Sequence, residues 1–297
     1  MKHRMKFIIP LAIIVLGIIF MVTGFYMGAA DDYKKSLNIT NMESVISASG
    51  VKNLDINVQA AEFFVKASNE VNDFTLVAEN ISKNNLDYSV NNGTFKFRYE
   101  VKKWYNYADM IGLMKGKGKI TLLVPANADL MDVQIVTGLS RAEISYLTAE
   151  RIYIEYGYGG ADIKNLSADH IEVGGKHGKA ECCNLNCKTS NINCKSGKLS
   201  IGNINVENIG LTCGSGDIQL NGVIGGDSIV SCGSGDLLMN IYGDLYDFKF
   251  ETQGKGISID GKKEIPDNDK GSKKINASCG MGEVKIYFKK KKNQLNH

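Results

Sequence analysis

Acidic residues recur along the C-terminal half of the chain, and a row of carboxylates could do three kinds of chemistry. The carboxylates could accept hydrogen bonds from the N–H groups of glycine-rich turns, bind Ca²⁺ through oxygen, or cleave glycosidic bonds as an acid pair. We favour hydrogen bonding, because the calcium nonapeptide Gly-Gly-x-Gly-x-Asp is not reproduced and no general-acid environment is evident. The row is Glu143, Asp162, Glu181, Asp217, Asp236 and Glu283, interrupted by Lys198 and Gly256, and we expect Lys198 to offset the charges of Glu181 and Asp217.

Cysteine and histidine are the other residues with chemical potential. All seven cysteines lie between Cys182 and Cys279, and an odd number fits a disulfide framework poorly. Cys194, Cys213 and Cys232 recur at one constant interval, which predicts an inward ladder of free thiols that pack as small hydrophobic side chains. A tighter group could bind zinc but lacks a Cys-x₂-Cys pair, so we predict no metal site; it consists of His177, Cys182, Cys183 and Cys187.

The sequence offers little for an enzyme. Of the four histidines, His3, His170, His177 and His297, none has an evident serine or cysteine partner for a catalytic triad. We therefore predict no catalytic residues, no cofactor and no small-molecule substrate. A carbohydrate-active enzyme built on a β-helix is the less favoured alternative.

A regular repeat organises these side chains. Short motifs such as Ala161-Asp-Ile163, Gly216-Asp-Ile218 and Gly235-Asp-Leu237 recur, with last-residue steps of 19, 19, 17, 19, 19, 20 and 27. Alternating apolar residues flank each motif, as in half-buried strands. A unit this short cannot bury its apolar face alone, so we predict an all-β fold whose successive coils stack as a parallel β-solenoid over residues 136–288. The long last step falls in a polar insertion at residues 261–271.

The segment before the solenoid, residues 45–135, also alternates but with less regular spacing. It should form either the first coils or an antiparallel β layer that caps the solenoid, because an open end would expose unpaired strand edges. The stretch from Val101 to Lys119 holds the only tryptophan, two tyrosines and several lysines. It could touch membrane or glycan, but we favour an ordinary insertion with its aromatic rings packed on the β layer.

The N-terminus predicts a membrane anchor. Residues 7–30 contain no charged side chain, and about 20 apolar residues suffice to span a bilayer as a helix. Basic residues 1–6 precede this segment and Asp31-Asp32 follows it, so residues 1–6 should be cytoplasmic, and residues 31–297 extracytoplasmic behind a stalk at 31–44. Cleavage as a signal peptide after Gly28-Ala-Ala30, giving a secreted protein, is the alternative.

Charge is distributed unevenly along a chain whose net charge is only +3. The first thirty residues carry +3, residues 31–288 carry 28 basic and 32 acidic side chains, and the tail 289–297 carries +4. A mildly acidic body argues against nucleic-acid binding. The tail could attract anionic envelope polymers or lipid headgroups, or it could serve as a solubilising cap that stops edge-to-edge growth of the solenoid.

The order of these motifs resembles the bacterial DUF4097 family of putative adhesins. Gly50-Val-Lys-Asn-Leu-Asp-Ile56, Asn92-Gly-Thr-Phe-Lys-Phe97, Ile120-Thr-Leu-Leu-Val-Pro125 and the repeated Ser-Gly-Asp-Ile turns carry the resemblance, over residues 45–288. It implies a β-strand-repeat domain at the bacterial cell envelope and supplies no catalytic residues. We expect an adhesin-like binding or scaffold protein, with an envelope-stress sensor or regulator as the alternative. Its partners would be the membrane through residues 7–30, and envelope polymers or a membrane regulatory protein.

Overall fold

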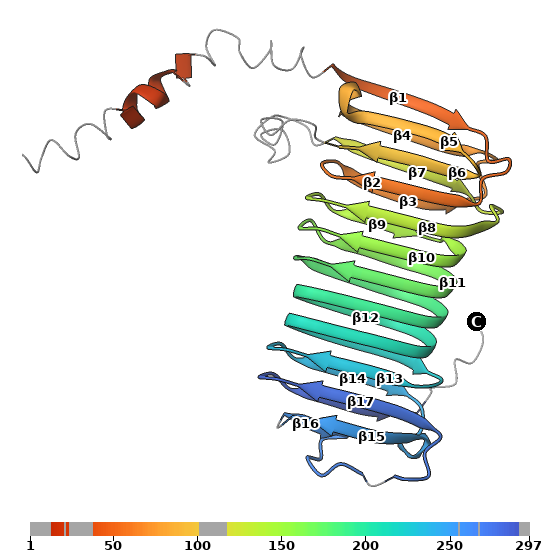
Figure 1. Ribbon diagram of the computed structural model, residues 1–297, viewed down its shortest axis with the longest axis vertical. Helices are drawn as coiled ribbons and strands as arrows, with labels where there is room; N and C mark the ends of the chain where they lie inside the picture. The colour runs from red at the N-terminus through yellow and green to blue at the C-terminus, as the bar shows by residue number, and fades with distance from the viewer. Residues whose placement is uncertain are drawn as a thin grey trace, which may run out of the picture.

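The computed structural model describes residues 13–20, 22–23, 38–100, 118–254, 256–266 and 268–290. Within these ranges, eighteen strands form a single sheet that curls along one long axis (Figure 1). The predicted all-β class is confirmed, and the arrangement is solenoid-like. The strands are β1 (Ile39–Ile46), β2 (Asn53–Val58), β3 (Glu62–Ser68), β4 (Phe74–Ser82), β5 (Leu86–Asn91), β6 (Thr94–Tyr99), β7 (Lys119–Pro125), β8 (Leu130–Thr137), β9 (Ala142–Ser145), β10 (Thr148–Tyr156), β11 (Ala161–Gly175), β12 (Lys179–Ile224), β13 (Ser228–Cys232), β14 (Leu237–Tyr242), β15 (Phe248–Gln253), β16 (Ile257–Ile259), β17 (Lys273–Cys279) and β18 (Val284–Lys289).

The central strands pair in parallel, each with its equivalent in the next coil. Strand β10 pairs with β11 so that Ile152 meets Ile171, and β11 pairs with β12 so that Val173 meets Ile192. The sequence separation is the same in both pairs, since 171 − 152 and 192 − 173 both equal 19. All four side chains are fully or almost fully buried, and Val173 and Ile192 continue an apolar ladder that starts at Ile154. In the other ladder, Ile171 is followed by the buried Ser190.

Both alternatives for the N-terminal β region are correct in part. Strands β2 and β3 pair in parallel with β8 and β9, and on their other side with β6 and β7, so they belong to the coils. Beyond them the pairing is antiparallel: β5 with β6, β4 with β7, and β1 with β4. This antiparallel layer covers the edge that the first coil would otherwise expose (Figure 1).

The last coils do not stack in chain order, contrary to our expectation of successive coils. Strands β17 and β18 pair with β13 and β14 on one side and with β15 and β16 on the other. The chain therefore runs outward to the terminal coil and returns between it and the preceding one (Figure 1). The long last step of the sequence repeat is the connection that makes this return possible.

The polar insertion at 261–271 closes the far end. Asn268 donates from Nδ2 to the carbonyl oxygens of Tyr246 (2.6 Å) and Phe248 (2.8 Å), and so pairs acceptors at the start of β15. Ile265 packs against the hydrophobic core. The insertion thus caps the edge strand, which composition alone did not indicate.

Three predicted segments fall largely outside the described residues. These are the apolar span 7–30, the stretch Val101–Lys119, of which residues 101–117 are not described, and tail residues 291–297. The described parts of the chain contain no helix long and apolar enough to cross a membrane. The tail follows β18, which lies between β14 and β16.

Candidate binding groove

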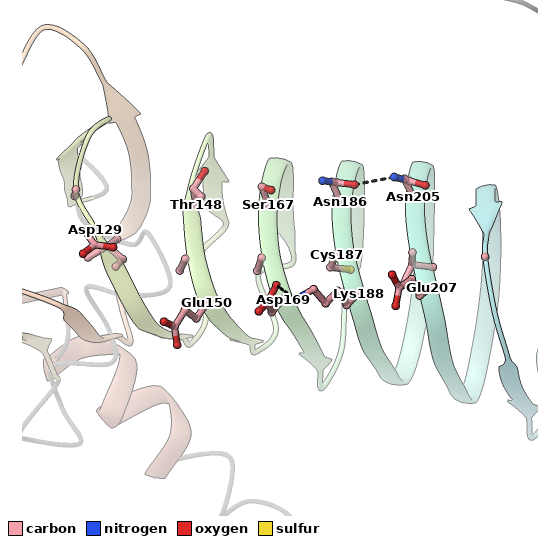
Figure 2. A pocket seen from close by; sticks show the side chains of 16 residues that line it. Asp129, Thr148, Glu150, Ser167, Asp169, Asn186, Cys187, Lys188, Asn205 and Glu207 are labelled. Carbon is pink, nitrogen blue, oxygen red and sulfur yellow. Dashed lines mark hydrogen bonds and ion pairs between the residues drawn. The ribbon is translucent and has the colours of Figure 1, made fainter.

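A shallow groove of about 640 Å³ runs along one side of the stacked coils (Figure 2). It crosses successive coils at the bend where one strand turns into the next. Its floor is made of small or medium apolar residues, one from each coil, and the small ones leave room that larger side chains would fill. The floor residues occupy equivalent positions of the repeat and are Leu130, Ala149, Ala168, Cys187, Val206 and Gly225.

Two rows of polar side chains form the walls of this groove (Figure 2). One row is Asp129, Thr148, Ser167, Asn186 and Asn205, and the other is Glu150, Asp169, Lys188 and Glu207. Asn205 donates from Nδ2 to Asn186 Oδ1 at 2.8 Å. Lys188 Nζ lies 2.9 Å from Asp169 Oδ1, and Lys52 pairs with Asp129. Four carboxylates against one lysine in the lining make the groove acidic.

A second asparagine ladder holds the backbone beside the groove. Asn165, Asn184 and Asn203 have φ values of 55°, 56° and 58°, a left-handed conformation that asparagine tolerates better than most residues. Asn184 donates to Asn165 at 2.7 Å, and Asn203 donates to Asn184 at 2.6 Å. We did not identify these residues from the sequence, although the regular recurrence of Asn-Leu-Ser167, Asn-Leu-Asn186 and Asn-Ile-Asn205 is a visible signal.

The acidic row predicted from the sequence is two rows. Glu143 pairs with Asp162, and Asp162 with Glu181, at the start of the strands. Asp217 and Asp236 lie instead in the turns, where the equivalent earlier residues are Lys179 and Lys198, since 198 − 179 and 217 − 198 both equal 19. The shortest step of the motif alignment, between Cys182 and Leu199, joined the two rows wrongly.

Backbone hydrogen bonds account for the acids in the turns. Asp217 Oδ1 accepts from the N–H of Asp236 at 3.1 Å, and Asp236 Oδ1 accepts from the N–H of Glu283 at 2.9 Å. Each carboxylate therefore satisfies the N–H of the next coil in space, whereas we expected it to satisfy its own turn. In the other row, Asp162 pairs with Arg141, and Glu181 pairs with Lys179 in place of the Lys198 that we expected.

Replacing Asp236 distinguishes hydrogen bonding from charge. Asp236→Ala should lower the free energy of unfolding by about 1–2 kcal/mol, the usual cost of losing a side-chain cap. Asp236→Asn keeps an acceptor oxygen and should retain most of that stability. Chemical denaturation of both variants measures this, and an equal loss in both would mean that the negative charge is what matters.

A family model decides the classification of this chain. The model described as Toastrack DUF4097 matches residues 51–296. The chain belongs to the DUF4097 family. The family match covers every coil that lines the groove, so the groove is part of the Toastrack domain itself.

Solved structures of low sequence identity are similar to this chain, and the first of them shares its overall fold. A putative adhesin from Bacteroides fragilis has a TM-score of 0.54 at 13% sequence identity, covering 84% of this chain and 97% of that one. A putative adhesin from Parabacteroides merdae has a TM-score of 0.47 at 9% identity, with 84% and 96% covered. A putative lipid binding protein from Parabacteroides distasonis has a TM-score of 0.32 at 12% identity, with 84% and 96% covered. Curated proteins gave no match.

The cysteine ladder of this DUF4097 protein lies in the core as predicted. Cys213 pairs in register with Cys232, and Cys232 with Cys279, and all of them are buried and free. In each case the thiol donates to the carbonyl oxygen of the glycine three residues later; Cys279 and Gly282 are 2.6 Å apart. The Cys-Gly-x-Gly motif thus closes a turn around a buried thiol.

Burial raises the pKa of these thiols, to about 11 for Cys213 and about 12 for Cys182. Because the pKa of the thiol is near 9 in the unfolded chain and higher in the folded protein, the thiol contributes stability below about pH 9. This contribution is lost as the pH rises toward the pKa of the folded state. We expect the temperature at the midpoint of unfolding to decrease as the pH is raised above about 9.

The buried thiols should also react slowly. At pH 8 an alkylating reagent should modify the less buried Cys183 first, with mass spectrometry as the readout. Rapid labelling of Cys213 would contradict the prediction.

The residues considered for zinc do not converge. Cys182 points into the core, Cys187 forms part of the groove floor, and His177 bonds to Ser196 and stacks on Tyr158. Over the described part of the chain, no three metal-binding side chains gather into a cluster. The alternation of side chains along a strand separates residues that are close in the sequence.

The structure gives two histidines hydroxyl partners that the sequence did not reveal. His177 Nδ1 bonds to Ser196 Oγ, and His170 Nδ1 lies 2.7 Å from Thr189 Oγ1. Each partner is 19 residues away and becomes a neighbour only through stacking. Glu172 lies 4.0 Å from His170 Nε2, which is too long for the hydrogen bond of a triad.

Proposed function

We propose that this DUF4097 protein is a membrane-anchored, extracytoplasmic binding protein of the bacterial envelope. Its body is a stiff β-solenoid that presents the lateral groove to a linear, hydroxyl-rich envelope polymer. A coil of 19 residues is supported by the separation between hydrogen-bonded partners such as Asn184 and Asn165. The family match and the name putative adhesin of the Bacteroides fragilis structure are consistent with such an adhesin-like role.

The groove is the observation that carries this proposal. Its equivalent positions repeat from coil to coil at the strand spacing of about 4.8 Å, so it offers a periodic surface to a periodic ligand. One wall carries amides and hydroxyls beside Asp129, the other carries three carboxylates and Lys188, and all of these groups can bond to sugar hydroxyls. The small floor residues allow a chain to lie along the groove without entering the core.

Two observations support the proposed membrane anchor: its uncharged sequence and its exposed apolar side chains. Residues 7–30 carry no charge, and the described helical residues within them expose large apolar side chains, including Ile13 (64%) and Phe20 (72%). Such side chains would be covered by lipid in a membrane. The basic residues 1–6 favour a cytoplasmic N-terminus, which puts the coils and their groove outside the cell.

Filling the groove tests the binding function. Detergent-solubilised full-length protein should cosediment with insoluble bacterial wall glycan, and Ala168→Trp, which places a large ring on the groove floor, should weaken this binding at least ten-fold, about 1.4 kcal/mol. Thr212→Trp is the matched control, because Thr212 is exposed on β12 and does not line the groove.

The same experiment separates binding from regulation. Equal cosedimentation by the Ala168→Trp variant would contradict a role for the groove. Recovery of a membrane sensor protein by the full chain, with no retention on glycan, would favour the regulatory alternative over the proposed one.

A further inference from the structure

The opposite end of each strand carries a second surface of different charge. Lys176-His-Gly-Lys179 and Lys195-Ser-Gly-Lys198 occupy the turns of two neighbouring coils. These turns stack directly: the N–H of Ser196 donates to the carbonyl of Lys176 at 3.2 Å, and a Cβ on Gly197 would lie 2.1 Å from Gly178 O. We call the four lysines and the neighbouring Tyr158, His177 and Ser196 the basic edge.

The fold does not require lysine at these positions. The next two coils have glycine at the first lysine position and aspartate at the second, in Gly214-Ser-Gly-Asp217 and Gly233-Ser-Gly-Asp236. There the aspartates bond to the N–H of the adjacent coil. The lysines replace a stabilising contact by stacked like charges, which repel each other.

Two of these four lysines form salt bridges within the protein. Lys176 Nζ lies 2.9 Å from Glu155 Oε1, and Lys179 pairs with Glu181. Within the described ranges, neither Lys195 nor Lys198 forms a salt bridge, and the side chains of both are exposed. Two cations are thus available to an external anion.

Side-chain hydrogen-bond donors lie next to these cations. Tyr158 is 61% exposed, and its ring stacks on His177 at 4.9 Å between centroids and 14° between planes. The bond between His177 Nδ1 and Ser196 leaves Nε2 as a second polar atom of the ring. Ammonium, phenol and imidazole groups together suit the oxygens of phosphate.

We propose that the basic edge binds a linear polymer with repeating phosphate groups, lying across the two coils. This goes beyond the proposed function, because the groove is acidic and takes a different ligand. The two surfaces are separate: residues 180–185 lie between the lysine turn and the groove residue Asn186. The two surfaces together would let one solenoid contact two kinds of envelope polymer.

The repeat itself supplies the test variant. Lys195→Gly with Lys198→Asp gives this coil the Gly-Ser-Gly-Asp turn of its neighbours, and the variant should therefore fold. Full-length protein in detergent is titrated with fluorescently labelled long-chain inorganic polyphosphate. We expect this variant to bind at least ten-fold more weakly than the wild type, and wild-type binding to weaken as salt is raised.

A charge-matched control and two further ligands make the test decisive. Lys262→Gly with Lys263→Asp causes the same change in net charge on an exposed loop and should leave binding unchanged. Equal weakening by both double variants, no binding by the wild type, or binding to phosphatidylglycerol vesicles in place of polyphosphate would each overturn the proposal. Ala168→Trp should keep polyphosphate binding, so failure of the groove and failure of the basic edge are distinguishable.

Discussion

Gly197→Ala should lower the free energy of unfolding by about 2–4 kcal/mol, as the sum of backbone strain and overpacking. Gly197 has a φ of 125°, and a Cβ there would lie 2.1 Å from the carbonyl oxygen of Gly178 in the adjacent coil. Because the obstacle is backbone, it cannot move aside as a side chain could. The coils around residues 178–197 would have to separate locally, and thermal or chemical unfolding of the full chain measures the loss.

Gly50→Ala is the matched control for this prediction. Gly50 also has a positive φ, of 74°, but nothing lies within 4 Å of the position that a Cβ would take. Gly50→Ala should lower the free energy of unfolding by about 1–2 kcal/mol, which is the cost of the backbone conformation alone. Equal losses for the two variants would show that close stacking of the turns contributes nothing at Gly197.

Phe97→Ala should destabilise the protein most, by about 3–5 kcal/mol. Phe97 is fully buried in β6, and its ring stacks on Phe63 with centroids 6.4 Å apart and planes at 10°. The side chain lies where the parallel coils meet the antiparallel layer, since Phe97 pairs with Ile56 on one side and Tyr88 on the other. Removing it leaves a cavity at that junction.

Tyr246→Ala provides the comparison, because Tyr246 is 72% exposed. A surface substitution of this kind should change the unfolding free energy by no more than about 0.5 kcal/mol. Denaturant unfolding curves of the two variants give the difference. A loss below about 1 kcal/mol for Phe97→Ala, outside the range for a buried phenylalanine, would mean that the junction is not packed as described.

Local sequence patterns are enough to predict the fold class, the inward thiols and the parallel ladders. Alternation with period two selects strands, and a repeat too short to bury its own apolar face forces stacking. Ile152, Ile171 and Cys213 could be placed inside on that basis, and all are buried. These conclusions needed only local pattern and the requirement to bury apolar surface.

Which coils become neighbours, and which polar residues meet, depends on long-range packing that these local patterns do not encode. A motif alignment can slip by two residues where a glycine-rich turn allows it, so Glu181 and Asp217 were assigned to one row. The return of β17 between β13 and β15 leaves only an unusually long repeat step in the sequence, and a long step does not say which coils become neighbours. The groove, the pairing of His177 with Ser196 and the stacked lysines of the basic edge exist only because the coils pack side by side.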